Sequence, residues 1–141
     1  MNKTDDAARY QAHPHRVAAF KQFYVGIDSL EQIAVAEDVL RASQTGEQLI
    51  LDARPDRRFT GEFEPLDPVA GHVPGAVNWP FDENLDMDGT FLPPEALREN
   101  YQALLKGKAP WQVLHMCGSG VTACHNVLAM EIAGLPGSRL Y

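Results

Sequence analysis

The fold of this chain is decided by residues 113–123, which read VLHMCGSGVTA. Residues 113–116 are typical of a short buried strand, and residues 121–133 follow the pattern of a helix. Cys117 and a glycine-rich turn lie between them. A buried strand that passes directly into a helix is typical of sheets covered by helices on both faces. The stretch therefore predicts an α/β fold with one thiol at the junction.

Cys117 stands where the sequence predicts a binding site for negative charge. The backbone N–H groups of such a turn and of a first helical turn lack carbonyl partners, so they converge on the atom inside the bend. Gly118 and Gly120 let these groups approach a sulfur atom closely. The donors and the helix dipole favour the thiolate. A cysteine at a strand end is more often a small buried hydrophobic residue, but this context favours a nucleophile.

Composition restricts the class of protein. A chain of 141 residues fits one domain that buries its core without disulfides or metal ions. The formal net charge of −7 disfavours nucleic acid and anionic membranes as partners. The first residues contain no apolar leader, and no segment is long and apolar enough to span a membrane. We therefore expect a cytoplasmic protein.

The cysteines and histidines do not predict a metal site. Cys117 and Cys124 have neither metal-ligand nor disulfide-framework spacing, and we expect Cys124 to pack in the core rather than act as a second thiol. None of the five histidines has metal-ligand spacing, and we expect no cofactor. His115 and His125 are expected to be packed or hydrogen-bonded. His72 precedes a Pro-Gly turn, which predicts a structural hydrogen bond to the backbone that holds the loop.

The chain divides into an arm and a domain. Residues 1–26 mix charges with scattered aromatic side chains and lack periodicity, so we interpret them as a linker or packing arm. Residues 27–141 form the predicted domain. Its first helix is expected to begin at a capping box formed by Ser29 and Gln32 and to end at Gly46. Residues 49–51 then predict a strand covered on both faces, which Asp52 closes.

The rest of the domain alternates between strands and helices. Residues 53–75 predict a long irregular loop of the kind that carries function. Further strands are predicted at 76–79, 113–116 and 139–141, and helices at 94–105 and 121–133. This order predicts a mainly parallel sheet flanked by helices on both faces. Ligands of such sheets bind at the carboxyl ends of the strands, where Asp52 and Cys117 both fall.

Three segments in this order resemble the rhodanese superfamily: LDAR (51–54), GHVPGAVN (71–78) and CGSGVTA (117–123). The resemblance covers about residues 27–141, and the last segment is similar to the short, uncharged loop of the mercaptopyruvate sulfurtransferase branch. It implies a rhodanese-like sheet and an enzyme, a sulfurtransferase. Cys117 would accept a sulfane sulfur from a small donor, become a persulfide and pass the sulfur to a thiol or to cyanide.

The resemblance also implies partners for this chain. The arm is similar to the segment that joins two tandem rhodanese domains, which makes this chain the second, catalytic one. The missing N-terminal rhodanese domain, or a second subunit, would then cover the site and supply a His and an Asp that assist Ser119. Family chains continue past the final strand, so we expect the domain to be truncated at Tyr141.

A persulfide anion needs several convergent donors, and the loop can supply them. Each charge-assisted contact contributes roughly 1.5–3 kcal/mol. Ser119 is the second candidate catalytic residue, because its hydroxyl could donate to the departing enolate or pyruvate oxygen; a solvated hydroxyl is the alternative. The hydroxyl of Thr122 is more typical of a helix start than of a catalyst. The candidate binding N–H groups belong to Gly118, Gly120, Val121 and Thr122.

The choice of donor follows from charge. Arg58 matches the carboxylate-binding arginine of the family, and a guanidinium can hold the one carboxylate of 3-mercaptopyruvate through two hydrogen bonds. Thiosulfate is a dianion that needs fixed cations, which the Cys117 loop does not offer, so we expect it to be the poorer donor. Leu66 stands where many family members have a second arginine. Arg54 and Arg57 are expected in ion pairs or solvent.

Two other functions stay open. Cell-cycle dual-specificity phosphatases are similar in fold, but their loop is one residue longer and ends with an arginine that grips phosphate. No arginine lies between Cys117 and Cys124, so we expect no phosphatase turnover. The second alternative is a non-enzymatic rhodanese module that relays sulfur or binds a partner.

Overall fold

The computed structural model describes residues 33–141. The arm of residues 1–26 and the predicted capping box at Ser29 and Gln32 lie outside this range. The strands are β1 (Leu49–Asp52), β2 (Val77–Asn78), β3 (Val113–Met116) and β4 (Arg139–Leu140). The helices are α3 (Ala36–Thr45), α4 (Asp56–Phe59), α5 (Pro94–Leu105) and α6 (Val121–Ile132), with short 3-10 helices η2 (Phe81–Asn84) and η3 (Pro110–Gln112).

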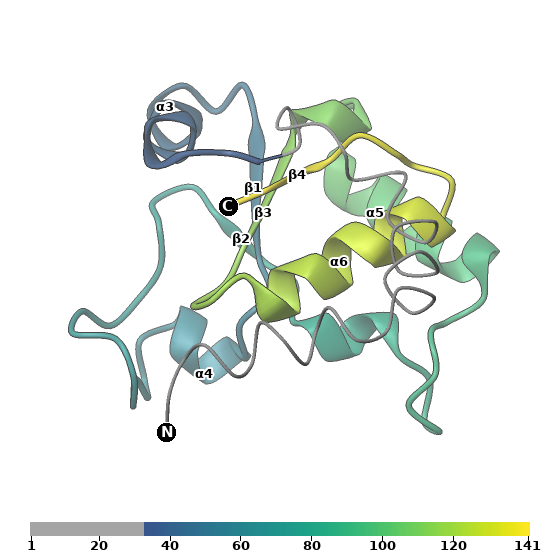
Figure 1. The fold of residues 1–141 in the computed structure, drawn as a ribbon, viewed down its shortest axis with the longest axis horizontal. Helices are drawn as coiled ribbons and strands as arrows, with labels where there is room; N and C mark the ends of the chain where they lie inside the picture. The colour runs from purple at the N-terminus through teal and green to yellow at the C-terminus, as the bar shows by residue number, and fades with distance from the viewer. Residues whose placement is uncertain (1–32) are drawn as a thin grey trace, which may run out of the picture. The chain divides into compact units, whose positions relative to one another are not determined.

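The four strands form one parallel sheet in the order β2-β1-β3-β4, which confirms the predicted parallel sheet. Leu51 pairs with Val77 on one side and with His115 on the other. Because all the strands run in the same direction, their carboxyl ends meet at one edge of the sheet (Figure 1). Asp52, at the end of β1, therefore lies beside Met116, the residue that precedes Cys117.

Helices cover both faces of the sheet, as predicted (Figure 1). Successive side chains of a strand point to opposite faces, so β1 divides its apolar residues between two cores. Ile50 packs with Val39 of α3 on one face. Leu51 packs on the other face with Leu97 of α5 and Met130 of α6. The two cores hold β1 and β3 rigidly, and the ends of these strands carry the site.

The predicted start of the first helix is wrong. The helix begins at Ala36, and residues 33–35 are extended. Ile33 forms a parallel bridge with Leu140, and the N–H of Ala34 donates to the Leu140 carbonyl at 2.7 Å. The carboxylate of Asp38 accepts a hydrogen bond from the N–H of Val35 at 3.1 Å, which caps the helix at this point. Pairing with the edge of the sheet therefore overrides local helix propensity.

The long loop 53–75 is less irregular than predicted, because it contains the short helix α4. The predicted strand 76–79 contracts to Val77–Asn78. Among residues 33–141, none of the helices has both the length and the apolar character that a membrane span requires.

Candidate active site

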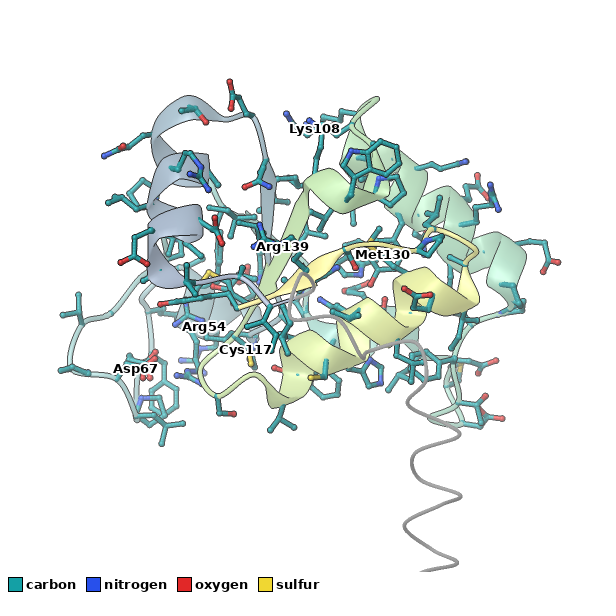
Figure 2. All side chains as sticks on the ribbon, turned by 45° about the horizontal axis from the view of Figure 1, so that its top comes forward. Arg54, Asp67, Lys108, Cys117, Met130 and Arg139 are labelled. Atoms are coloured by element: carbon teal, nitrogen blue, oxygen red, sulfur yellow. The ribbon has the colours of Figure 1, made fainter. Side chains whose placement is uncertain are left out.

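Cys117 follows β3 directly and is half-buried. Residues 118–120 turn the chain from the end of the strand into α6. Gly120 occupies the N-cap position of α6 with φ 83°, a left-handed conformation that glycine adopts without strain. Figure 2 shows Cys117, Arg54 and Asp67 together at one end of the sheet, with Lys108 at the other.

The sulfur of Cys117 accepts hydrogen bonds from the loop and from the first turn of α6. The N–H of Gly120 lies 3.0 Å from Sγ. The hydroxyl of Thr122 and the N–H groups of Ala123 and Ser119 lie near the sulfur and lower the pKa of the thiol. Of the predicted amide donors, that of Gly120 faces the thiol, as an anion-binding site requires, whereas those of Gly118, Val121 and Thr122 form no hydrogen bond to the sulfur within residues 33–141.

These donors change the acidity of the thiol. Burial raises the pKa of Cys117, but the Thr122 hydroxyl and the amides of Ala123, Ser119 and Gly120 together outweigh this effect. The pKa of Cys117 therefore lies below the ordinary value for cysteine. A larger fraction of Cys117 is consequently thiolate near neutral pH, which is the nucleophilic form.

The structure corrects the role expected for Thr122. Its hydroxyl lies near Cys117 Sγ and lowers the pKa of the thiol, whereas the sequence favoured a helix-start hydroxyl. Gly120 is the N-cap of α6, and no side chain caps this helix. Ala123, which the sequence did not single out, supplies an amide donor because it lies in the first turn of α6 above the sulfur.

Thr122→Val is expected to raise the pKa of Cys117, because valine keeps the shape of threonine and removes a hydroxyl donor to the thiolate. The rate of alkylation by iodoacetamide, followed against pH, reports this pKa. All variants carry Cys124→Ser, so that one thiol reacts. Thr45→Val is the control, because the Thr45 hydroxyl bonds the Arg41 carbonyl at the end of α3. An unchanged alkylation profile in Thr122→Val would exclude the hydroxyl as a donor.

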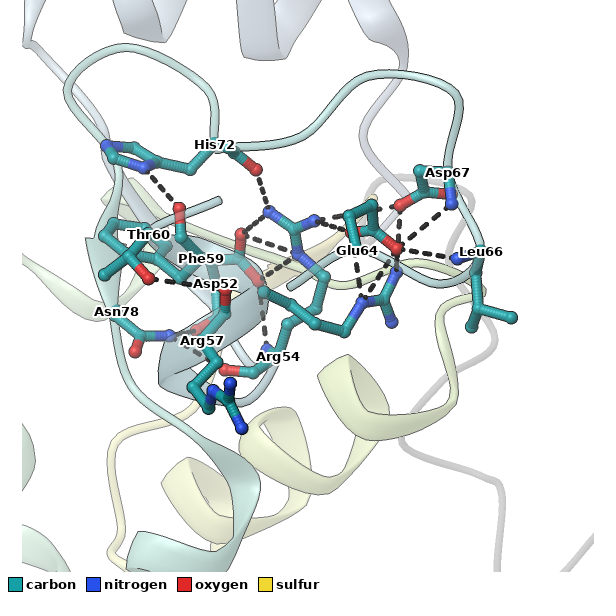
Figure 3. Close-up of polar contacts among 12 residues, drawn as sticks. Asp52, Arg54, Arg57, Phe59, Thr60, Glu64, Leu66, Asp67, His72 and Asn78 are labelled. Atoms are coloured by element: carbon teal, nitrogen blue, oxygen red, sulfur yellow. Dashed lines mark hydrogen bonds and ion pairs between the residues drawn. The ribbon is translucent and has the colours of Figure 1, made fainter. Parts of the chain in front are cut away.

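Asp52 and Arg54 form a buried ion pair beside the loop. Asp52 is fully buried, and the Arg54 side chain is 7% exposed. The Nη2 of Arg54 donates to Oδ2 of Asp52 at 2.7 Å and to the carbonyl of Gly71 at 2.8 Å. In Figure 3 the guanidinium of Arg54 lies between Asp52 and Glu64. The pair therefore ties the loop 53–75 to the carboxyl end of β1.

Arg58 lies against the cysteine loop. A Cβ at Gly118 would meet Nη1 and Nη2 of Arg58, each at 3.6 Å, in ordinary van der Waals contact. Glu64 accepts hydrogen bonds from Nε and from Nη2 of Arg58, the latter at 2.9 Å. The Arg58 guanidinium and the N–H groups of Asp67 and Leu66 lower the pKa of Glu64 to about 2. Arg58 is therefore fixed beside the residue that follows Cys117.

One nitrogen of Arg58 faces the loop without a protein partner. Nε and Nη2 are occupied by Glu64, and Nη2 also donates to Asp67 at 3.0 Å. Within residues 33–141, Nη1 donates to no protein atom. It is the nitrogen best placed to receive an anion beside Gly118.

A surface hollow of about 230 Å³ opens beside Cys117. Most of its lining residues belong to the loop 53–75, and Met116 of β3 and Cys117 complete the lining. Its residues are Arg54, Asp67, Val69, Ala70, Gly71, His72, Val73, Met116 and Cys117. The sequence did not single out Asp67, because a loop without periodicity gives no signal of which side chains face inward.

His72 makes the backbone hydrogen bond that the sequence predicts. Its Nδ1 lies 2.7 Å from the carbonyl oxygen of Phe59, and its ring stacks on the Phe59 ring with centroids 3.7 Å apart. Arg57 forms an exposed ion pair with Glu62 at 3.1 Å. Ser119 is exposed at the turn, and its hydroxyl stays a predicted catalytic group.

The expectation for Cys124 is wrong, because this thiol is exposed on α6 rather than packed in the core. Although the residue is exposed, partial burial of its sulfur and the proximity of Cys117 raise the pKa of Cys124, which disfavours its thiolate. His115 is fully buried against the sulfur of Met130, and burial lowers its pKa to about 3. No group of three His, Cys, Asp or Glu side chains in residues 33–141 is arranged to hold a metal ion.

The fold and the site define a class of protein: a parallel α/β sheet in which the loop from a central strand into a helix directs a backbone amide at a half-buried cysteine thiol. The chain matches the family of the Rhodanese-like domain over residues 35–141. It belongs to this family.

Named relatives support this assignment. The chain is 55% identical over 92 residues to the probable 3-mercaptopyruvate sulfurtransferase of Pseudomonas aeruginosa, covering 65% of this chain and 32% of that protein. It is 34% identical over 116 residues to the thiosulfate sulfurtransferase of Mus musculus, covering 80% and 39%. The crystal structure of SseA from Escherichia coli, a 3-mercaptopyruvate sulfotransferase, matches with a TM-score of 0.62 and 34% identity, covering 80% and 42%. The chain thus spans about a third to two fifths of these proteins.

Proposed function

We propose that this chain is the catalytic domain of a sulfurtransferase that carries a sulfane sulfur as a persulfide on Cys117. The observation that carries the proposal is the strand-to-helix turn in which the Gly120 N–H donates to Cys117 Sγ at 3.0 Å. The Thr122 hydroxyl and the Ala123 and Ser119 amides beside the sulfur also lower the pKa of the thiol. The same donors would stabilise a terminal sulfur anion. The family and the named relatives support the reaction class.

The proposed donor is 3-mercaptopyruvate, with thiosulfate as the poorer alternative. The Cys117 thiolate attacks the sulfur of the donor, the carbon–sulfur bond breaks, and its electron pair leaves as the enolate of pyruvate, which takes up a proton. Arg58 would hold the carboxylate, and Ser119 would donate to the departing enolate oxygen. A thiolate or cyanide acceptor then attacks the outer sulfur, and Cys117 returns as thiolate. No cofactor takes part.

A further domain or a second subunit is proposed to cover the site. The loop 53–75 carries exposed apolar side chains: Phe63 is 54% exposed, Leu66 76% and Val69 78%. Val121, at the start of α6, is 72% exposed. Val69 also lines the hollow beside Cys117, and exposed apolar side chains of this kind suit a covering partner that excludes water from the persulfide.

The mass of the protein after incubation with each donor tests the proposal. We expect a gain of one sulfur atom that cyanide removes and that maps to residue 117. Cys124→Ser should keep this gain and Cys117→Ser should lose it. A sulfur that maps to Cys124, or no gain with either donor, contradicts the proposed reaction.

The same samples separate the alternatives. Loading from a persulfidated protein but from neither small donor would indicate a relay module. Hydrolysis of an aryl phosphate that vanishes in Cys117→Ser would indicate a phosphatase.

A further inference from the structure

Asp67 occupies the position on Arg58 that an anionic donor would need. A guanidinium Nη group carries two hydrogens. On Nη2 of Arg58, Glu64 accepts at 2.9 Å and Asp67 at 3.0 Å. The carboxylate of Glu64 accepts hydrogen bonds from Nε and Nη2 along one edge of the guanidinium. A second carboxylate can bind at the tip of the guanidinium, where Nη1 and Nη2 each present a hydrogen. Asp67 already takes the Nη2 half of that end.

The charges around the hollow also single out Asp67. Two carboxylates, Asp52 and Glu64, face the two arginines, and their side chains are 0% and 4% exposed. These four groups balance. Asp67 adds a third carboxylate, 3.7 Å from Nη1 of Arg54 and 3.0 Å from Nη2 of Arg58. The three carboxylates and two arginines therefore carry one excess negative charge. Asp67 is the most exposed of the five groups, with a side chain that is 41% exposed.

This excess charge lies in the wall of the hollow that contains Cys117. Asp67, Arg54, His72 and Cys117 are its titratable lining residues, and the rest of the lining is apolar or glycine. Arg54 is occupied by Asp52 and by the carbonyl of Gly71. An incoming anion can approach Arg58 at Nη1, but it gains the second hydrogen bond of the guanidinium end only where it displaces Asp67 from Nη2.

We propose that Asp67 is a specificity-determining residue: it competes with anionic donors for Arg58 and discriminates against donors of higher negative charge. This inference rests on the proposed function, because it names the selection made at the same site. When a donor with one carboxylate displaces Asp67 from Arg58, the negative charge of the donor takes the place of the negative charge of Asp67. A dianion such as thiosulfate brings a second negative charge, so the repulsion from Asp67 acts on it about twice as strongly.

The charge effect can be measured without sulfur transfer. Cys117 is alkylated by iodoacetate, an anion, and by iodoacetamide, which is neutral and of similar size. Because iodoacetamide reports the thiolate itself, the ratio of the two rates reports the potential at the sulfur. In a Cys124→Ser background, Asp67→Asn is expected to raise the ratio of the iodoacetate rate to the iodoacetamide rate by about threefold to tenfold.

Glu62→Gln is the matched control. It removes one negative charge from the same loop, but Glu62 is 63% exposed and paired with Arg57, and it does not line the hollow. Its ratio should stay near that of the unchanged protein. An unchanged ratio in Asp67→Asn, or an equal rise in both variants, overturns the proposal.

Sulfur loading from the two donors completes the test. Asp67→Asn should raise kcat/KM for 3-mercaptopyruvate by about threefold and for thiosulfate by about tenfold, chiefly through KM. Equal changes for the two donors, or a fall for both, contradict discrimination by charge. If no variant accepts sulfur while the alkylation ratio still rises in Asp67→Asn, the charge effect stands and the sulfurtransferase assignment fails.

Discussion

Replacing Asp52 with alanine is expected to lower the free energy of unfolding by about 3–5 kcal/mol, because it leaves a buried charge without its main partner. The Asp52 carboxylate accepts hydrogen bonds from Nε and Nη2 of Arg54 and from the Arg54 backbone N–H. The Arg54 side chain stays buried when this partner is removed, because the Gly71 carbonyl and Glu64 still hold it. Urea denaturation followed by circular dichroism measures the change.

Glu62→Ala is the control for this prediction, because it also removes the carboxylate of an arginine ion pair. Its pair with Arg57 is exposed on both sides, at 65% and 63%. Exposed pairs contribute about 0–1 kcal/mol, so the control should unfold close to the unchanged protein. Equal effects of the two substitutions would show that the Asp52 pair contributes no more than a surface contact.

Arg58→Ala is expected to reduce kcat/KM for 3-mercaptopyruvate by about a hundredfold or more, because two charge-assisted hydrogen bonds to a carboxylate contribute roughly 3–5 kcal/mol. The guanidinium lies against Gly118, directly after Cys117, with Nη1 open toward the loop. Steady-state formation of pyruvate measures the effect. Thiosulfate use should fall less, because we expect no bidentate carboxylate contact for that donor.

Two further variants separate geometry from charge at Arg58. Arg58→Lys keeps the positive charge beside Asp67, but an ammonium cannot bind a carboxylate through two parallel hydrogen bonds. The kcat/KM for 3-mercaptopyruvate should therefore fall, and the kcat/KM for thiosulfate should change little. Arg57→Ala removes an exposed arginine from the same helix and should affect neither donor. Equal losses for both donors in Arg58→Ala and Arg58→Lys would remove the carboxylate-binding role.

Much of the fold was predictable because its signals are local. Residues 113–116 and 94–105 have the predicted bounds as β3 and α5, because a short apolar run and a proline-started amphipathic pattern identify such elements within the segment itself. The start of α3 was not predictable in this way. Residues 33–35 take extended geometry from Leu140, more than a hundred positions away in the chain.

The same division holds at the site. Cys117, the turn after it and the amides of Ser119 and Gly120 lie within four residues, so sequence alone indicated an anion-binding bend. The hydroxyl of Thr122 and the exposure of Cys124 depend on how α6 is rotated about its axis, which packing against the sheet decides. A helical pattern predicts which face is buried only where that face is clearly apolar.

By itself, the sequence determined that a thiol would stand between a buried strand and a helix, surrounded by N–H donors, because the chemistry of that bend is contained in seven consecutive residues. Only the tertiary structure decided what faces the thiol. Arg58, Glu64 and Asp67 reach the Cys117 loop because Arg54 ties the loop 53–75 to Asp52 at the end of β1. The physical reason is that the interaction energy of two charges depends on their separation in space. Residues far apart in the sequence acquire a defined separation only once the chain has folded.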